Sequence, residues 1–279
     1  MGRYRGDLQM TRKGRFTQRN TKLYLSDSPI SKRVMLCVPM TGLLRAEWVL
    51  ARYGQMIPTN WSHGELIQWM DMHVPMGFGV AEARNMAVKH FIEGNWEWLF
   101  FIDHDVIMPL DTFSKYNQRM HKKEIPIWGG LYFTKSVPSE PLIYREWGHS
   151  YFTDWRMGDE VWVRGMGMGC NVIHRSVLEL LYKDSEEYEW GGHKMRKVFV
   201  TPQTAGLDPV TGIWQNSGGT EDIFFYDRII KGNYLAKAGW PKVAKKKYPY
   251  LCDTSVFCRH TDMNGKQYPA NGEEKAYAR

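Results

Sequence analysis

Two aspartates separated by one residue, Asp103 and Asp105, have the type and spacing to bind one ligand together. They directly follow the apolar and aromatic segment 96–102, which predicts a buried strand. Ligands of open α/β sheets bind at the carboxyl ends of strands, and alternate residues of an extended segment point the same way. Because two converging carboxylates repel each other, the pair predicts a divalent metal ion between them. The alternative is a strand-end turn in which one aspartate caps the next helix.

A second pair of acids, Glu221 and Asp222, follows Gly218, Gly219 and Thr220 at the start of an apolar segment. Thr220 is a preferred helix N-cap, and carboxylates in the first turn suit the helix dipole, so a structural role explains at least one acid. A carboxylate at a helix start beneath a glycine-rich loop is also well placed to accept a proton from a substrate. Glu221 and Asp222 are therefore candidate catalytic residues.

A glycine-rich run, residues 165–169, follows a predicted strand and precedes a predicted helix. It lacks the third glycine of the dinucleotide fingerprint G-x-G-x-x-G, and no acidic residue stands at the later position that this fingerprint requires. We therefore reject a dinucleotide-binding loop. Glycines at such positions indicate that another group, either a ligand or a packed loop, comes close to the backbone.

Histidine and cysteine are the remaining residue types that bind metals. His260 follows the last predicted strand and could join a two-carboxylate metal site, although a lone histidine is more often structural. The four cysteines contain no CxxC pair and no zinc-like spacing to the histidines. Reduced thiols in an intracellular compartment are the simplest interpretation, and two bridged pairs in an oxidised protein stay open as the alternative.

The elements that must position these residues can be read from the apolar patterns. Strands and helices alternate in the first half of the chain, which predicts an α/β fold with a mainly parallel sheet and helices on both faces. The second half is more irregular. Strands are expected near 34–38, 96–102, 125–133, 141–145, 160–164 and 250–257, and helices over 44–53, 79–93, 110–121, 175–183 and 219–231.

Charge is distributed unevenly along the 279 residues. Residues 1–33 contain nine Lys and Arg against two Asp, whereas the rest of the chain holds equal numbers of basic and acidic residues. A basic arm can contact phosphates of nucleic acid or lipid, but a solvated leader is the commoner outcome. We predict a basic arm over 1–33, one domain over 34–262 and a polar tail over 263–279.

The amount of apolar sequence bounds the class of protein. With 43% apolar and 24% charged residues, the chain can bury a substantial core, which excludes a disordered protein. No apolar run approaches the roughly 18 residues of a membrane span, and no apolar stretch follows the basic N-terminus as in a signal peptide. We expect a cytoplasmic protein, or one that rests on a membrane surface.

Taken in order, these pieces resemble the A-type-fold (GT-A) glycosyltransferases, particularly their family-two-like group, which transfer sugars from nucleotide diphosphates. The segments that carry the resemblance are 38–39, 83–85, 100–106, 129–132, 165–171, 220–222 and 253–260. Each is weak alone, but their order and spacing are fairly specific and extend over about 34–262. The resemblance implies a Rossmann-like, mainly parallel sheet flanked by helices, with a more irregular C-terminal half that receives the acceptor.

The resemblance also implies roles for individual residues. The nucleotide, the donor sugar and Mn²⁺ or Mg²⁺ would share one site, and Asp222 would deprotonate the acceptor hydroxyl beside Glu221. Residues implied to bind the donor are Pro39, Thr41, Arg84, Asn85, Asp103, Gly129, Gly130 and Gly167; those implied to ligate the metal are Asp105, His260 and Asp103.

The sequence thus predicts a metal-dependent, inverting hexosyl- or related glycosyltransferase. Its donor would be a UDP- or GDP-sugar, and its acceptor a hydroxyl group of a carbohydrate, lipid or protein. A retaining glycosyltransferase of the same fold is one alternative, and a nucleic-acid-binding protein that uses residues 1–33 is another. A nucleotidyltransferase fits less well, because residues 39–45 hold only one glycine and one arginine where such enzymes carry a basic, glycine-rich phosphate loop.

Overall fold

The computed structural model describes residues 34–55, 70–94, 96–146, 151–207, 210 and 214–277. The chain divides into two units, Met1–Ser31 and Lys32–Arg279, and every described residue belongs to the second. The predicted basic arm therefore lies outside the described residues.

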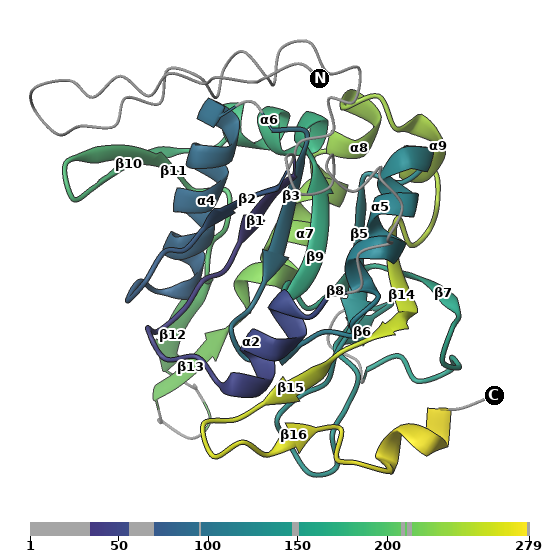
Figure 1. The fold of residues 1–279 in the computed structure, drawn as a ribbon. Helices are drawn as coiled ribbons and strands as arrows, with labels where there is room; N and C mark the ends of the chain where they lie inside the picture. The colour runs from purple at the N-terminus through teal and green to yellow at the C-terminus, as the bar shows by residue number, and fades with distance from the viewer. Residues whose placement is uncertain are drawn as a thin grey trace, which may run out of the picture. The chain divides into compact units, whose positions relative to one another are not determined.

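A seven-stranded sheet is the largest element of the described residues (Figure 1). Five of its strands run in one direction, as the predicted mainly parallel sheet requires, and two run against them. In spatial order the strands are β2 (Met70–His73), β1 (Val34–Cys37), β3 (Trp98–Ile102), β9 (Cys170–His174), β5 (Ile127–Leu131), β14 (Tyr250–Phe257) and β7 (Glu160–Val163). The sheet is therefore mixed, because β9 and β7 are antiparallel to their neighbours.

The direction of β9 has a simple cause. The glycine-rich run lies at the carboxyl end of β3, where the Gly169 carbonyl accepts a 2.9 Å hydrogen bond from the backbone N–H of Asp103. A strand that begins there must run back along β3. β9 also pairs with β5, and between these two strands the described residues hold β8 (Gly165–Met166) and other short strands but no crossover helix, which a parallel pairing would require.

The remaining elements surround this sheet. The short strands are β4 (Val106–Ile107), β6 (Ile143–Tyr144), β10 (Glu187–Trp190), β11 (His193–Arg196), β12 (Gln203–Leu207), β13 (Trp214–Gly218), β15 (Arg259–Thr261) and β16 (Gln267–Tyr268). The helices are α2 (Ala46–Tyr53), α4 (Val80–Gly94), α5 (Thr112–Lys122), α6 (Arg175–Lys183), α7 (Glu221–Lys231), α8 (Tyr234–Lys237), α9 (Pro241–Ala244) and the 3₁₀ helix η1 (Glu273–Tyr277).

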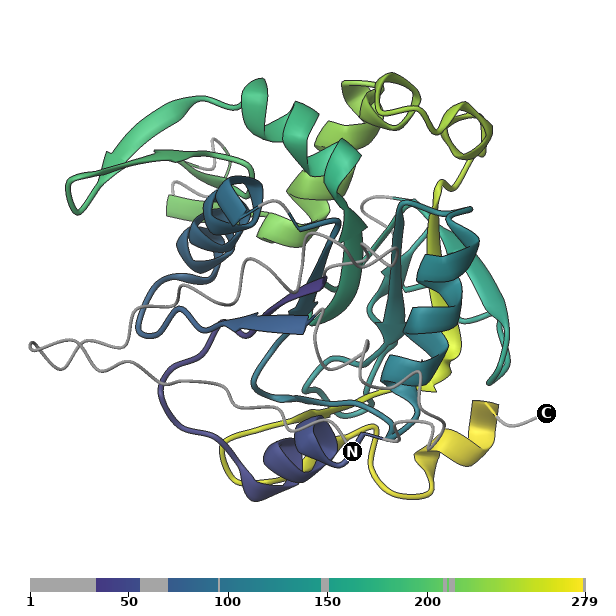
Figure 2. The same ribbon diagram turned by 45° about the horizontal axis from the view of Figure 1, so that its top comes forward.

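Both faces of the sheet are covered, as β3 shows. All five of its residues are buried, and they alternate between two cores: Leu99 and Phe101 belong to one, Trp98, Phe100 and Ile102 to the other. Helices α4, α6 and α7 supply the first core, and α2 and α5 supply the second. Figure 2 shows α4 and α5 on opposite sides of the sheet. A continuous apolar run is what a strand buried on both faces requires.

Residues after 262, predicted to be a polar tail, instead pack onto the domain. β16 pairs with β15, which pairs with β4 directly after the two aspartates. The ring of Tyr277 stacks on Trp155 with centroids 4.4 Å apart, and the Met157 N–H donates to the Tyr277 carbonyl at 2.8 Å. Tyr268 and Tyr277 supply the apolar contacts that the polar composition of this segment hides.

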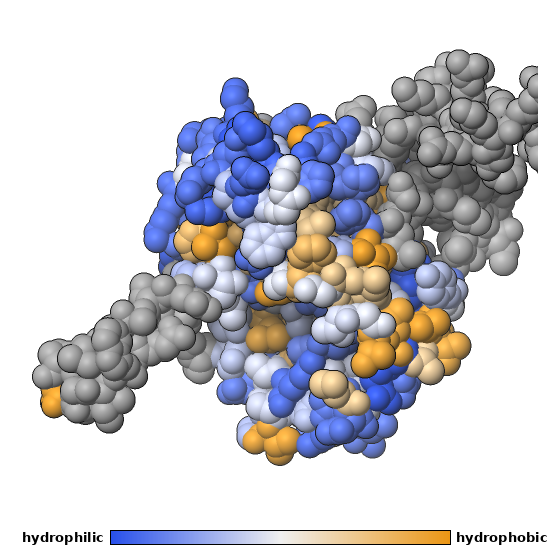
Figure 3. All heavy atoms as spheres, turned by 90° about the vertical axis from the view of Figure 1, so that its left-hand side faces the viewer, coloured by the Kyte–Doolittle hydropathy of each residue, from blue (hydrophilic) through white to orange (hydrophobic). Residues whose placement is uncertain are grey.

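The described surface carries an apolar region. Large exposed apolar side chains come from α2 and the loops around it, among them Leu43, Leu50, Tyr53, Met76 and Phe78. Figure 3 shows hydrophobic residues gathered toward one side of the face that it draws. No helix within the described residues is long and apolar enough to cross a membrane.

Candidate functional site

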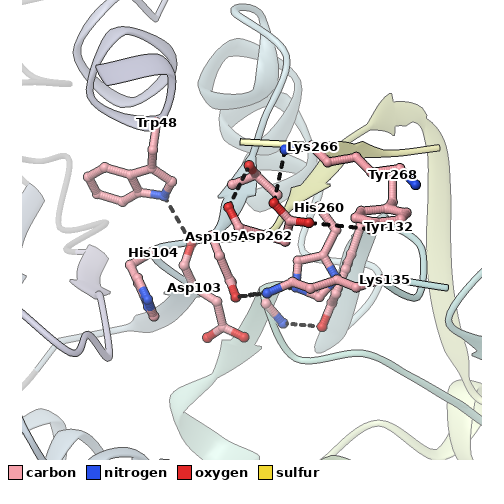
Figure 4. A network of polar contacts seen from close by, with 12 residues as sticks. Trp48, Asp103, His104, Asp105, Tyr132, Lys135, His260, Asp262, Lys266 and Tyr268 are labelled. Atoms are coloured by element: carbon pink, nitrogen blue, oxygen red, sulfur yellow. Dashed lines mark hydrogen bonds and ion pairs between the residues drawn. The ribbon is translucent and has the colours of Figure 1, made fainter. Parts of the chain in front are cut away.

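The turn that follows β3 is held by contacts from several parts of the chain. The carbonyl of Asp103 accepts hydrogen bonds from the Val106 N–H at 3.1 Å and from the Trp48 indole N–H at 2.9 Å (Figure 4). The Asp105 carbonyl accepts from the Thr261 N–H at 2.8 Å, which joins the turn to β15. Because the backbone is fixed on both sides, the two carboxylates project from a rigid position at the carboxyl end of the central strand.

The Asp103 carboxylate forms a buried ion pair. Arg84 Nη2 donates to both Asp103 carboxylate oxygens, at 2.9 and 3.0 Å, and Arg84 Nη1 donates to Glu221 Oε1. The Arg84 side chain is 3% exposed. Burial disfavours its charge, but the carboxylates of Asp103 and Glu221 outweigh this cost and raise the pKa of Arg84 above its ordinary value. One guanidinium therefore links the end of β3 to the start of α7.

The Asp105 carboxylate has different partners. Its Oδ2 accepts a hydrogen bond from Lys135 Nζ at 2.5 Å and lies 3.4 Å from His260 Nε2. His260 Nδ1 donates to the Phe133 carbonyl at 2.8 Å, which turns Nε2 toward Asp105. Burial favours the protonated acid, but His260 and Lys135 overcome it and hold the pKa of Asp105 well below its ordinary range. Figure 4 shows the Lys135 side chain reaching Asp105 from its loop.

Asp222 lies in the first turn of α7, next to Glu221. Its Oδ1 accepts hydrogen bonds from the Thr220 hydroxyl and, at 2.7 Å, from the Ile223 N–H. Thr220 is the N-cap residue of α7, as predicted, but its side chain donates to Asp222 and makes no capping hydrogen bond to the helix backbone. Among the described residues, no donor contacts Oδ2 of Asp222. Burial raises the pKa of Asp222, while Arg84 opposes that effect. The result is a half-buried carboxylate with one unused oxygen.

The predicted donor-binding glycines are explained by protein packing. A Cβ on Gly129 would lie 2.7 Å from Asn171 Nδ2, and one on Gly130 would lie 2.7 Å from Val256 Cγ1. A Cβ on Gly167 would lie within 2.3 Å of the hydroxyl of Tyr132. These glycines make room for neighbouring side chains, so their presence needs no ligand. Contact between them and a donor sugar remains a prediction.

Among the described residues, no hydrogen bond joins the other predicted donor contacts, Pro39, Thr41 and Asn85, to the carboxylates of Asp103 and Asp105. The Asn85 amide donates to the Phe199 carbonyl at 2.9 Å and accepts from the Phe199 N–H at 2.8 Å, and its side chain is buried. The Pro39 carbonyl accepts from His104 Nδ1 at 3.1 Å, so the loop after β1 contacts the turn after β3. Thr41 is exposed in that loop. The structure therefore gives Asn85 a packing role and leaves Thr41 open to solvent.

The predicted metal ligands are brought together only in part. Asp105 and His260 are neighbours, whereas Asp103 binds Arg84 with both oxygens. Within the described parts of the chain, no group of three or more His, Cys, Asp and Glu side chains could hold a metal ion. All four cysteines are buried free thiols.

Three residues at the site were not assigned roles from sequence. Lys135 contacts Asp105, the Trp48 indole contacts the backbone of Asp103, and Tyr132 is buried against the glycine-rich run, where its hydroxyl accepts from the Gly169 N–H at 2.9 Å. The only signal for Lys135 and Tyr132 was their place at the carboxyl end of the predicted strand 125–133, beside which ligands bind. Nothing in the sequence pointed to Trp48.

The chain matches no protein family in sequence, and it matches no curated protein. Among solved structures it is similar to A197 from STIV, with 17% identity and a TM-score of 0.49 over 82% of this chain and 86% of that chain. It is also similar to S. aureus TarS, with 11% identity and a TM-score of 0.33 over 56% of this chain and 30% of that chain. The complex of TarS 1–349 with UDP gives 12% identity and a TM-score of 0.32, over 53% and 48%. Likeness at this level assigns neither family nor function.

Proposed function

We propose that this chain is a GT-A-like glycosyltransferase that moves a sugar from a UDP- or GDP-linked donor to an acceptor hydroxyl with inversion. The observation that carries the proposal is the gathering of acidic groups at the carboxyl end of β3. Asp103 and Asp105 project from the strand end, and Arg84 links Asp103 to the start of α7, where Asp222 lies. Ligands of α/β sheets bind at this edge.

The charges around the aspartates suit an anionic donor. Side-chain exposures of 21% for Asp103 and 25% for Asp105 leave both carboxylates within reach of solvent. Arg84 balances the charge of Asp103 from inside the protein, while the more exposed Lys135 and His260 face Asp105 and would meet the diphosphate. The Asp103 carboxylate is also a suitable acceptor for ribose hydroxyls.

Asp105 and His260 fit two positions in the coordination shell of Mn²⁺ or Mg²⁺. Because the Phe133 carbonyl can only accept a hydrogen bond, Nδ1 of His260 carries a proton, and Nε2 is the ring nitrogen that faces Asp105. Carboxylate and imidazole suit Mn²⁺, and the donor diphosphate would supply further oxygens. When bound, the ion would stabilise negative charge on the leaving diphosphate. Asp103 is committed to Arg84 and would stay outside this shell.

Asp222 is the proposed general base. The acceptor hydroxyl would give its proton to the unused Asp222 oxygen while the acceptor oxygen bonds to the anomeric carbon. The bond between that carbon and the diphosphate oxygen breaks, and its electron pair leaves with the nucleoside diphosphate. Burial strengthens the base by raising the pKa of Asp222 above its ordinary value.

Donor binding is tested by thermal unfolding with UDP- and GDP-sugars, in the presence and absence of Mn²⁺. A ligand at 100 times its dissociation constant stabilises a protein by about 2.7 kcal/mol, which gives a clear rise in melting temperature. We expect one class of nucleotide sugar to raise it, and Mn²⁺ to increase the rise. A set of donors that leaves the melting temperature unchanged at millimolar concentration would contradict the proposal.

The role of Asp222 is tested by Asp222→Asn. Loss of a general base should lower the transfer rate by about 10²- to 10⁴-fold while the donor dissociation constant changes little. Asp227→Asn, five residues further along α7, where Asp227 pairs with Arg164 and Lys231, is the control and should keep the rate near wild type. In the wild type, the rate should fall as acid protonates Asp222, and the raised pKa places that fall above pH 3.8, the ordinary Asp value. A near-normal rate for Asp222→Asn would favour a retaining mechanism.

A further inference from the structure

The Lys135 ammonium lies where a cation would be expected beside Asp105. It is 2.5 Å from Asp105 Oδ2, the same oxygen that faces His260 Nε2 at 3.4 Å. Among the described residues, Asp105 is the only ion-pair partner of Lys135. We propose that Lys135 is a built-in cation that competes with a divalent metal ion for the Asp105 carboxylate. This inference rests on the metal site of the proposed function.

Lys135 and a metal ion would compete for Asp105 because both are positively charged and would occupy the same place beside its Oδ2. Asp105 Oδ2 accepts a hydrogen bond from an ammonium at 2.5 Å, so a positive charge already lies against the oxygen that faces His260. A metal ion would bind that oxygen at about 2.0–2.2 Å and would bring two further positive charges next to the ammonium. Like charges at such distances repel strongly in a partly buried site. The ammonium must therefore leave Oδ2 before a metal ion can bind between this oxygen and His260.

The structure allows Lys135 to leave without disturbing its backbone. Two hydrogen bonds between Thr134 and Glu140 hold its loop. The Thr134 N–H donates to the Glu140 carbonyl at 2.9 Å, and the Glu140 N–H donates to the Thr134 hydroxyl at 3.0 Å. The Ser136 hydroxyl also bonds the Pro138 carbonyl at 2.9 Å. The Lys135 side chain itself is 34% exposed, so rotation about its own bonds carries the ammonium into solvent.

The cation beside Asp103 cannot be exchanged in the same way. The Arg84 side chain is 3% exposed, and its guanidinium bonds Asp103 and Glu221 together. Moving it would leave two carboxylates without a partner in a buried place, at a high energetic cost. The two aspartates therefore differ: Asp103 is neutralised permanently, and Asp105 is neutralised by a side chain that can be displaced.

The same segment of chain positions both neighbours of Asp105. The Phe133 carbonyl orients His260 through Nδ1, and Lys135 stands two residues later. Without a metal ion, the ammonium keeps Asp105 paired and in place. With one bound, the displaced ammonium is free to pair with an anion such as a phosphate oxygen.

The experiment measures Mn²⁺ binding by electron paramagnetic resonance without any nucleotide. Lys135→Met should bind Mn²⁺ at least tenfold more tightly than the wild type, because the competing charge is gone. Lys135→Arg keeps the charge and should bind about as weakly as the wild type. Lys115→Met is the matched control: Lys115, on α5, is similarly exposed and pairs with Asp111 just before that helix, so its loss should leave Mn²⁺ affinity unchanged. In the double variant Lys135→Met, Asp105→Asn, the gain in Mn²⁺ affinity should be lost.

The proposal is overturned if Lys135→Met binds Mn²⁺ as weakly as the wild type or more weakly. It is also overturned if neither the wild type nor Lys135→Met binds Mn²⁺. Lys135→Gln provides a second uncharged variant, and the melting temperature verifies that each variant folds. The result is separate from the proposed function, because donor binding and sugar transfer are not used. Tighter Mn²⁺ binding by Lys135→Met, with no nucleotide sugar bound by any form, would keep this inference and reject the glycosyltransferase.

Discussion

At the scale of single residues, Arg84 offsets the repulsion between the carboxylates of the acidic site. Three carboxylates of Asp103, Glu221 and Asp222 lie near one another, and each disfavours the charge of the others. Arg84 contacts two of them directly from inside the protein. A buried cation with two anionic partners is costly to break, since removing one side leaves the other without compensation.

Arg84→Met should therefore destabilise the protein by about 3–5 kcal/mol at pH 7, measured by urea unfolding. The loss should be smaller at pH 5. Burial raises the pKa of Glu221 and Arg84 opposes that effect, so the folded-state pKa of Glu221 rises further without the guanidinium. A carboxylate whose pKa is raised by folding destabilises the protein at high pH, and this loss is relieved as pH falls through the raised value. A loss that stays the same or grows toward pH 5 would show that the carboxylates are not what Arg84 stabilises.

Arg119→Met is the matched control for this prediction. Arg119 also bridges two acids, Glu160 at 3.0 Å and Asp253 at 2.7 Å, but it lies on α5, away from the candidate site. It should lower stability while leaving nucleotide binding unchanged. Arg84→Met should lower stability as well, and the protein that remains folded should bind the nucleotide more weakly.

At the scale of elements, the structure separates two roles for helix α4. Arg84 faces the strand end, while the next residue, Asn85, bonds the backbone of Phe199 on both its N–H and its carbonyl. Successive helical residues point about 100° apart, so neighbours in sequence serve different surroundings. The resemblance placed both residues at the nucleotide, and the contacts place only Arg84 beside the acids.

Asn85→Ala should cost about 1–3 kcal/mol in unfolding free energy, because two buried backbone groups of Phe199 lose their partners. The donor dissociation constant should stay within twofold of the wild type. Lys89→Ala, on the same helix, removes a surface pair with Glu93 and should change stability by less than about 0.5 kcal/mol. A large loss of donor affinity with little loss of stability would return Asn85 to the nucleotide pocket.

Much of the element order could be predicted from the sequence, since long apolar periods are strong signals. The strand at 96–102 and the helices at 79–93, 110–121, 175–183 and 219–231 are confirmed to within a few residues. Two strands of the large sheet, the central β9 and the edge strand β2, are absent from the predicted strands. β9 directly follows a glycine run, and β2, with the sequence Met-Asp-Met-His, is short and has polar residues at alternate positions.

The parts of the site that depend on the order of residues along the chain could be predicted from the sequence. The parts that depend on tertiary contacts could not. The position of Asp103 and Asp105 at a strand end followed from the apolar run before them. Their partners did not: Arg84 and Lys135 stand 19 and 30 residues away in sequence from the aspartates that they bond. Which carboxylate receives a buried arginine and which an exposed lysine depends on packing, and no local pattern encodes it.

At the scale of the whole molecule, charge divides the chain into two parts with different expected partners. Nine Lys and Arg against two Asp stand in residues 1–33, and the remaining residues are balanced. The acidic site of the body and a basic arm would attract different ligands. Binding to a polyanion through such an arm is electrostatic and carries a steep dependence on salt.

Removal of residues 1–33 should therefore abolish binding to a labelled single-stranded nucleic acid, measured by fluorescence anisotropy. For the full chain, raising salt from 50 to 200 mM should lower affinity by about 300-fold if six of the basic residues contact phosphate of a single strand. Nucleotide-sugar binding by the shortened chain should match the full chain, because the residues proposed to bind the donor lie after residue 34. If the shortened chain binds nucleic acid with the same affinity and the same salt dependence, the body binds it, and the nucleic-acid-binding alternative would then compete with the glycosyltransferase for the acidic edge of the sheet.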